Sequence, residues 1–287
     1  MTNTRTTKTN HYFRGMTALV VLAMVAAMLL TAKPSYASTT FTVTNTNDSG
    51  AGSLEQAILD ANANGNPSEV DRIDFDIPGT GVKTISPNSV PPIITEPVVI
   101  DGYSQHGSSV NTLARGTNAK LLVQIDGTDS PGGLTVQASH SVVKGLVLNR
   151  FSGGVAIDIS PQRSAEVVTD VRIEGNFIGT DPTGNLDRGN AGGVDLFAAS
   201  NNTIGGTSRA ARNLISGNDR NGVQIAGGAT FGRGRSDHNV VRGNLLGTQR
   251  DGLKPLGNDS SGVGIFGDDA DGNSILSNPS SPTRSRA

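Results

Sequence analysis

The chain has 287 residues, of which 37 are glycine, none is cysteine and 35% are hydrophobic. Without cysteine, neither disulfides nor thiolate metal sites can stabilise the protein, so its stability must come from packing. The 25 acidic residues outnumber the 23 basic ones, which argues against a nucleic-acid partner. Short apolar runs separated by Gly and Asn recur along the chain, and this pattern is typical of many short strands with tight turns.

The amino end has the features of a signal peptide. Basic residues precede an uncharged apolar run at 16–32, and the small residues Ser35 and Ala37 predict cleavage after Ala37. Four basic and no acidic residues lie in residues 1–37, so cleavage leaves 250 residues with a formal charge of −6. We expect a secreted or cell-surface protein with no later membrane span; an uncleaved anchor helix is the alternative.

One helix is predicted in the mature chain, at residues 53–62. Its apolar residues recur at helical spacing and share one face: Leu54, Ala57, Ile58 and Ala61. Ser53 followed by Gln56 forms a capping-box pattern. A short amphipathic helix beside a solenoid is expected to cover the open apolar end of the first coil. Residues 38–97 are therefore predicted to form this cap and the first coils, with a strand at 71–77 and an irregular proline-rich connection at 87–97.

An internal repeat follows, because the stretch 171–197 recurs at 239–266. Seven residues recur unchanged at a constant offset of 68 positions: Gly175, Asn176, Gly179, Thr180, Gly184, Gly189 and Asn190. A weaker copy at 213–218 lies between the two, so the long period contains shorter ones. The elementary turn is predicted to be about 20 to 30 residues, which is a solenoid period.

The content of each turn predicts an all-β solenoid, a right-handed parallel β-helix over residues 98–276. Helical repeats need runs of about 10 residues at helical spacing, whereas runs such as 121–125 and 155–159 are short and rich in Val, Ile and Leu. Stacked strands about 4.8 Å apart would enclose aliphatic ladders. Gly and Asn tolerate the positive φ of corners, and stacked Asn amides are expected to hydrogen-bond from turn to turn.

The segment from Phe41, FTVTNTNDSGAGSLEQAILDAN, resembles the CSLREA-type amino-terminal segment of bacterial right-handed parallel β-helix repeat proteins, which are surface or secreted proteins. Residues 53–58, SLEQAI, stand where the usual pattern is close to SLREAI; its Cys is missing and Arg-Glu is replaced by Glu-Gln. The strings PVVIDGYSQ, GNFIGTDPTG and NNTIGGT are similar to what such proteins repeat. The resemblance implies the fold and an extracellular location, and little about activity.

Acidic clusters are the residues to test for catalysis, because right-handed β-helices include polysaccharide lyases and hydrolases. The candidates are Asp74 with Asp76, which share a strand face, the turn from Asp126 to Asp129, and residues 268–271. Acids in Gly-rich loops are commonly solvated without chemistry, which is the interpretation that we favour. The Gly-His-Gly string expected of a polygalacturonase is absent. No catalytic residue is therefore assigned.

Metal binding has one weak candidate. Four oxygen-bearing side chains that calcium could use fall within six residues: Asp268, Asp269, Asp271 and Asn273. The run lacks the downstream Glu and the alternation of an EF-hand loop, so no cofactor is assigned and calcium stays the only metal considered. The histidines of the mature chain have no paired spacing and are assigned to surface turns: His106, His140 and His238.

Neither aromatic nor basic residues predict a binding site. The mature chain has no Trp and only Tyr103 among its tyrosines, and the repeat-strand phenylalanines are assigned to core packing: Phe177, Phe197 and Phe266. A polar groove built from Asn, Asp and Arg stays open. The arginines of the middle repeats are interpreted as solvated loop charges: Arg209, Arg212, Arg220, Arg233, Arg235 and Arg242.

Repetition favours a non-catalytic structural or adhesive protein, because equivalent turns present equivalent surfaces whereas an active site needs one turn to depart from the pattern. The alternative is a pectate-lyase-like or glycosidase-like enzyme acting on polysaccharides. The expected partner is an extracellular glycan or a surface protein. Residues 277–287 are predicted to be a disordered tail. The final coil then lacks a cap, so we expect either that the chain is a piece of a longer repeat array or that this end binds a partner or a second copy of the chain.

Overall fold

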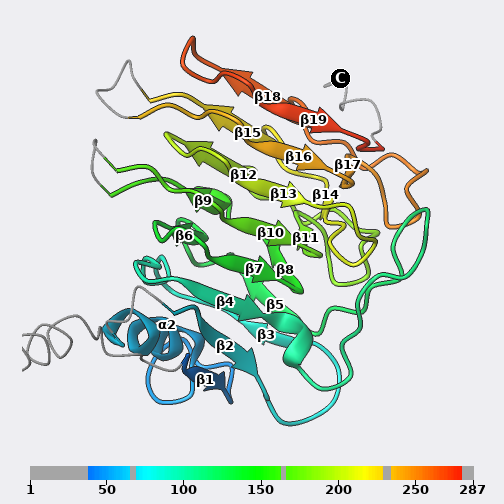
Figure 1. The fold of residues 1–287 in the computed structure, drawn as a ribbon. Helices are drawn as coiled ribbons and strands as arrows, with labels where there is room; N and C mark the ends of the chain where they lie inside the picture. Colours follow the sequence, from blue (N-terminus) through cyan, green and yellow to red (C-terminus); the bar gives the residue numbers. More distant parts are fainter. Residues whose placement is uncertain (1–37, 65–68, 163–165, 229–233, 280–287) are drawn as a thin grey trace, which may run out of the picture. The chain divides into compact units, whose positions relative to one another are not determined.

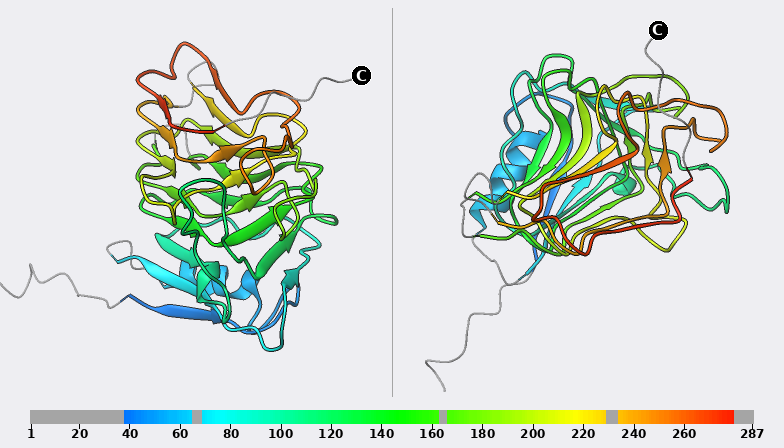
Figure 2. Two further views of the ribbon diagram at one scale, coloured as in Figure 1. Left: turned by 90° about the vertical axis from the view of Figure 1, so that its right-hand side faces the viewer. Right: turned by 90° about the horizontal axis from the view of Figure 1, so that it is seen from above.

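The structure is a computed structural model that describes residues 38–64, 69–162, 166–228 and 234–279. The expected signal peptide at 1–37 lies outside the described residues. Three sheets of parallel strands stack coil upon coil into a column, with one described α-helix, α2 (Leu54–Ala63), beside the first strands (Figures 1 and 2). A short 3-10 helix, η1 (Gly102–Ser104), follows β4. The predicted all-β parallel β-helix is confirmed.

Successive coils contribute strands to the three sheets in turn, although the coils at the two ends do not supply a strand to every sheet. Sheet A contains β1 (Thr40–Val43), β2 (Asp71–Phe75), β4 (Val98–Asp101), β7 (Val142–Lys144), β10 (Arg172–Glu174), β13 (Thr203–Gly205), β16 (Val240–Arg242) and β19 (Ser274–Leu276). Sheet B contains β3 (Lys83–Ile85), β5 (Val123–Asp126), β8 (Leu146–Asn149), β11 (Phe177–Ile178), β14 (Leu214–Ile215) and β17 (Leu245–Leu246). Sheet C contains β6 (Leu134–Val136), β9 (Val155–Ile159), β12 (Gly192–Phe197), β15 (Val223–Ala226) and β18 (Val263–Phe266).

Most coils are longer than the sequence predicted. In sheet A, Arg172 pairs with Thr203 and Thr203 pairs with Val240, so successive coils take 31 and 37 residues, which together make the 68-residue repeat. The estimate of 20 to 30 residues was too short for these two coils, although it fits the coil from Arg72 to Val99, which takes 27 residues. The repeated sequence unit therefore spans two coils.

Aliphatic side chains stack in register inside the column. In sheet A the inward row consists of Phe41, Ile73, Ile100, Val143, Ile173, Ile204, Val241 and Ile275. Ile73, Ile100 and Ile173 are fully buried. Burial of one such side chain stabilises a fold by about 1.5–3 kcal/mol, so these ladders are the main source of stability in a chain without disulfides.

The helix α2 packs where it was predicted, one residue later. Leu54, Ala57, Ile58 and Ala61 are buried in the same cluster as the inward strand residues. The Ser53 hydroxyl accepts a hydrogen bond from the Gln56 backbone N–H at 3.1 Å, as a capping box requires. The Gln56 side chain instead donates to Asp60, so only half of the predicted box forms.

Three ladders of asparagines run along the three corners, as the sequence predicted. They are Asn176, Asn213, Asn244 and Asn278 between sheets A and B; Asn190, Asn218 and Asn258 between B and C; and Asn202, Asn239 and Asn273 between C and A. The Asn213 Oδ1 accepts from the Asn176 backbone N–H at 2.8 Å, and the Asn213 Nδ2 donates to the Asn244 Oδ1 at 2.8 Å. Gly175 and Gly243, each with positive φ, turn the chain into this corner.

The ordered column extends past the predicted boundary at Leu276. Asn278 accepts from Asn244 and donates to the Val241 carbonyl, so it continues the ladder, and the expected tail is described only to Pro279. The last strands expose apolar side chains to 41–50%: Ile265, Phe266, Ile275 and Leu276. Self-association through this end stays a prediction.

A long connection, residues 105–122, lies over the outer face of sheet B, and we call it the strap. Its residues Ala119 and Leu121 pack on Phe177, Leu214 and Leu245, which point outward from sheet B. Leu121 therefore belongs to the strap, and β5 begins at Val123 instead of at the predicted residue 121. Figure 1 shows the strap rising along the right-hand side of the column towards the loop at 248–255.

Arginines from later coils hold the strap by its backbone carbonyls. Arg212 donates to the Gly116 carbonyl at 2.7 Å, and Arg250 donates to the Thr117 carbonyl at 3.1 Å. The Thr117 N–H donates back to the Arg250 carbonyl at 2.7 Å. Arg209 is exposed but donates to Thr112. The interpretation of Arg212 as a solvated loop charge was wrong, because its partners come from a segment about 100 residues away in sequence that could not be foreseen.

Replacement of Asn213 by Ala tests the ladders. The variant leaves the Ile173 carbonyl and the Asn176 N–H buried without partners, so we expect the free energy of unfolding to fall by about 2–4 kcal/mol in urea denaturation. The loop variant Asn185→Ala is the control and should change it by less than about 0.5 kcal/mol. Equal effects of the two variants would contradict a structural role for the ladder.

The hydrogen bonds between Arg212 and the strap lead to a second prediction. Arg212→Ala removes its hydrogen bonds to the carbonyls of Leu113, Ala114 and Gly116, so amide hydrogen exchange in residues 111–119 should accelerate about tenfold or more. Arg188→Ala, which removes only a local hydrogen bond to the neighbouring carbonyl, is the matched control. Unchanged protection of the strap in Arg212→Ala would show that packing alone holds it.

Candidate functional site

The first predicted acidic pair does not form a site. Asp74 lies on the outer face of sheet A, where Arg72 contacts both its carboxylate at 2.8 Å and that of Asp101 at 3.0 Å. Lys144 contacts Asp101 at 2.9 Å from the next coil. Asp76 follows the end of β2 and is exposed. Asp74 therefore belongs to an ion-pair network that spans three coils, which supports the structural interpretation.

The second predicted acidic turn is also engaged in local contacts. The Asp126 Oδ1 accepts from the Thr128 hydroxyl at 2.6 Å and from its backbone N–H at 3.1 Å, while Oδ2 pairs with Arg150 at 2.5 Å. Asp129 is exposed. The Asp126 carboxylate thus stabilises the turn that follows β5 and links it to the next coil.

The four side chains considered as weak calcium ligands have different surroundings. Asn273 occupies an internal ladder, where it accepts from the Asn239 N–H. Asp271 pairs with Arg235 on the surface, Asp269 is 7% exposed beside Gly227, and Asp268 is exposed. No group of three or more His, Asp or Glu side chains placed to hold a metal occurs among the described residues. The four side chains do not converge on one point.

The histidines lie on the surface, as predicted. His106, His140 and His238 are exposed. His140 and His238 have positive φ and occupy equivalent corner positions three coils apart, so they cannot share a metal ion. His140 lies 3.6 Å from the Asp170 carboxylate and lines an open groove of about 480 Å³. Among the arginines of the middle repeats, Arg233 lies outside the described residues.

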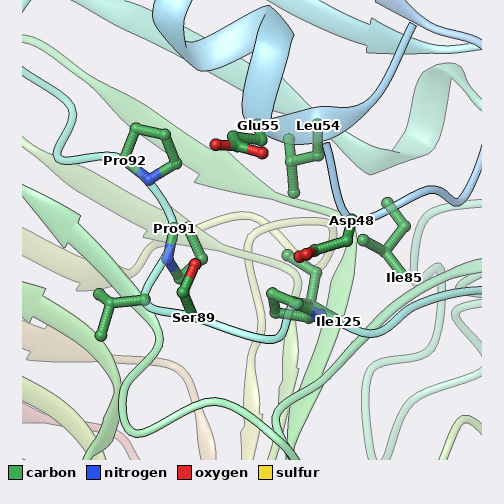
Figure 3. A pocket seen from close by; sticks show the side chains of 10 residues that line it. Asp48, Leu54, Glu55, Ile85, Ser89, Pro91, Pro92 and Ile125 are labelled. Atoms are coloured by element: carbon green, nitrogen blue, oxygen red, sulfur yellow. The ribbon is translucent and has the colours of Figure 1, made fainter. Parts of the chain in front are cut away.

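A small pocket separates α2 from the proline-rich connection, and Figure 3 shows it from close by. Leu54, Ile85 and Ile125 line its apolar floor, and its volume of about 20 Å³ is enough for about one water molecule. Asp48, at its edge, accepts hydrogen bonds from the backbone and side chain of Asn88. The pocket is therefore a gap in the packing of the capped end and offers no room for a ligand.

The outer face of sheet C carries the candidate site, a row of residues in register that we call the polar row. Thr135, Asp158, Asp195, Gln224 and Gly264 pair in succession on β6, β9, β12, β15 and β18. All five are partly exposed, and from β6 to β15 they alternate with buried inward residues. Neighbouring strands lie about 4.8 Å apart, so the row is an evenly spaced polar track across the face.

Two carboxylates are neighbours in this row. Burial, together with the negative charge of Asp158, raises the pKa of Asp195 to about 6, and Arg220 opposes the rise. Asp158 accepts a hydrogen bond from the Ser160 hydroxyl at 2.7 Å. Asp195 therefore exchanges a proton around pH 6, and in its protonated form the carboxyl is a hydrogen-bond donor as well as an acceptor.

Amides and an aromatic ring continue the row. The Gln224 side chain donates to Asp195 at 3.5 Å and accepts from the Asn221 Nδ2 at 3.0 Å. Phe266 is 50% exposed, and its ring fills the space above Gly264, where a Cβ would lie 2.6 Å from the ring. Core packing is confirmed for Phe177, which is buried under the strap, and was wrong for Phe266.

Sequence analysis missed this site because its members are far apart in the chain. Asp158 and Asp195 are single acids inside apolar strands, and neither belongs to an acidic cluster. The alternation in residues 155–159 shows that Asp158 points outward. Only the register of β9 with β12 shows that Asp195 is its neighbour.

Replacement of Asp195 by Asn tests the electrostatics of the row. Because the pKa in the fold lies above the ordinary value of 3.8, ionisation of Asp195 opposes folding, and this penalty grows as the pH rises from about 4 to 6. The substituted amide does not ionise, so at pH 7 the variant should be more stable by on the order of 2 kcal/mol, and the difference should vanish near pH 4. Urea denaturation at a series of pH values measures the difference; a pH-independent difference for Asp195→Asn would contradict the raised pKa.

Comparison of the chain with protein-family models and with curated proteins finds no match. In the part of the chain that the structure describes, no helix is long and apolar enough to cross a membrane. The polar row is therefore interpreted from its own geometry.

Proposed function

We propose that this protein is an exported, non-catalytic structural or adhesive protein of the cell surface or extracellular space, related to the CSLREA-type β-helix proteins that its sequence resembles. Its column supplies a rigid frame, and its partner is an extracellular glycan or a surface protein. The signal-peptide pattern of residues 1–37 supports export.

One observation carries the proposal: four successive coils place a polar side chain at the same outward position, from Thr135 to Gln224, without converging on a point. A catalytic site needs groups from several elements aimed at one reacting atom. A row of side chains about 4.8 Å apart instead offers weak, repeated contacts along an extended partner, and such contacts suit adhesion. The paired charges on sheet A support the same interpretation, since ionic contacts occupy them within the fold.

A specific observation also favours the second candidate, a polysaccharide hydrolase. Asp158 and Asp195 lie on adjacent strands in register, and the carboxylates of retaining glycosidases are about 5 Å apart. The raised pKa of Asp195 is the property expected of a general acid. In this alternative Asp195 would protonate the leaving oxygen and Asp158 would attack the sugar.

A pull-down and release assay distinguishes the two functions. We expect the mature protein to sediment with insoluble cell-wall polysaccharide and to release no reducing ends or unsaturated products from pectin, alginate or neutral glycans, with or without calcium. Asp195→Asn should likewise release no products. Release of products by the native chain that drops at least a hundredfold in Asp195→Asn would favour the hydrolase, since loss of a general acid costs about 10²–10⁴ in rate.

A further inference from the structure

We infer that the carboxyl-terminal part of the polar row is a binding site for a neutral sugar unit of a glycan. Phe266, Asn221, Gln224 and Asp195 form this site around Gly264, which has no side chain. This inference rests on the proposed adhesive function and adds the ligand class and the residues that bind it. A pyranose ring has an apolar face of C–H groups and a rim of hydroxyls, so it needs an aromatic surface beside hydrogen-bonding side chains.

Phe266 supplies the aromatic surface. In the preceding coils the equivalent positions of β15 and β12 hold Ala226 and Phe197, whereas Phe266 exposes half of its side chain. Its Cε2 and Cζ lie 2.6 and 2.9 Å from the point where a Gly264 Cβ would stand, so the ring bends back over the row. A side chain at position 264 would push the ring away, and this makes the glycine part of the site.

Asn221 supplies the observation that points to a ligand. It is 6% exposed, and its Nδ2 donates to Gln224. The same Nδ2 lies 3.2 Å from the position that a Cβ on Gly264 would take, beside the Phe266 ring. Its Oδ1 is buried without a hydrogen-bond donor. A buried acceptor without a partner costs about 1–3 kcal/mol. If the Asn221 amide turns towards the ring, a ligand hydroxyl there can donate to this oxygen and remove that cost.

The charges around the site select a neutral ligand. The carboxyl of Asp195 lies next to Gln224 and that of Asp158 lies one strand further away, and their negative charge would repel an anionic sugar. Hydroxyl groups can both donate to carboxylates and accept from the Gln224 amide. The site therefore fits a neutral, hydroxyl-rich ring better than a uronate.

Titration calorimetry with soluble oligosaccharides tests the inference on the full mature chain. The probes are hexasaccharides of β-1,4-linked glucose, xylose, mannose and N-acetylglucosamine, with hexagalacturonate as the anionic comparison. We expect at least one neutral probe to bind and hexagalacturonate to bind at least tenfold more weakly. Phe266→Ala and Gln224→Ala should each weaken binding about tenfold, and Phe266→Tyr should retain it. Leu276→Ala, which truncates a similarly exposed side chain on sheet A, is the matched control and should change affinity less than twofold.

The outcomes separate this inference from the proposed function. Phe266→Ala should have the native circular dichroism spectrum; if it does not fold, Gln224→Ala and Phe266→Tyr decide the matter. Retention on cell-wall material by the native chain and by both alanine variants alike would leave the adhesive function standing and overturn the site. Binding of no neutral probe, or tighter binding of hexagalacturonate, would overturn the ligand class. Neutral binding accompanied by hydrolysis would overturn the proposed function and leave the site in place.

Discussion

The whole column depends on one constraint: each coil must bring its backbone back to the same three corners, one strand spacing above the last. Strands of two residues, such as β11 and β14, cannot fix this register alone. The asparagine ladders fix it, because each Oδ1 accepts from the preceding coil and each Nδ2 donates to the next Asn or to a carbonyl. A buried amide is costly without partners, so an asparagine at a corner is stable only when the neighbouring coils place their own groups opposite it. The ladders therefore couple coils whose loops differ in length.

The strap adds a contact that a simple solenoid lacks. In a stack where each repeat touches only its neighbours, stability is a sum of local terms and the ends fray independently. Here a segment from an early coil lies over the outer face of sheet B and is held by Arg212 and Arg250 from later coils. The apolar row of Phe177, Leu214 and Leu245 explains why this cover is stable, since it buries side chains that would otherwise face water.

The three outer faces consequently have different properties. Ion pairs among Arg72, Asp101 and Lys144 occupy sheet A, and the strap covers sheet B. Sheet C presents polar side chains with a raised carboxyl pKa at Asp195 and a half-exposed ring at Phe266. The candidate site is thus on the face that the fold leaves open, and its evenly spaced groups suit an extended partner. The same inward ladders support all three faces, so the differences arise only from the outward residues.

The sequence by itself determined the fold class, the helix at its amino end and the presence of asparagine ladders, because these depend on local periodicity and on a repeat that can be read along the chain. It also placed the exposed histidines correctly. Only the tertiary structure decided the coil length, the role of Arg212 and the position of the site. The physical reason is that parallel stacking makes neighbours of residues 30 to 40 positions apart, and the register that pairs Asp158 with Asp195 depends on the loop between them. Likewise the strap meets partners about 100 residues away, and a hydrogen bond from an arginine to a distant carbonyl leaves no pattern in the sequence.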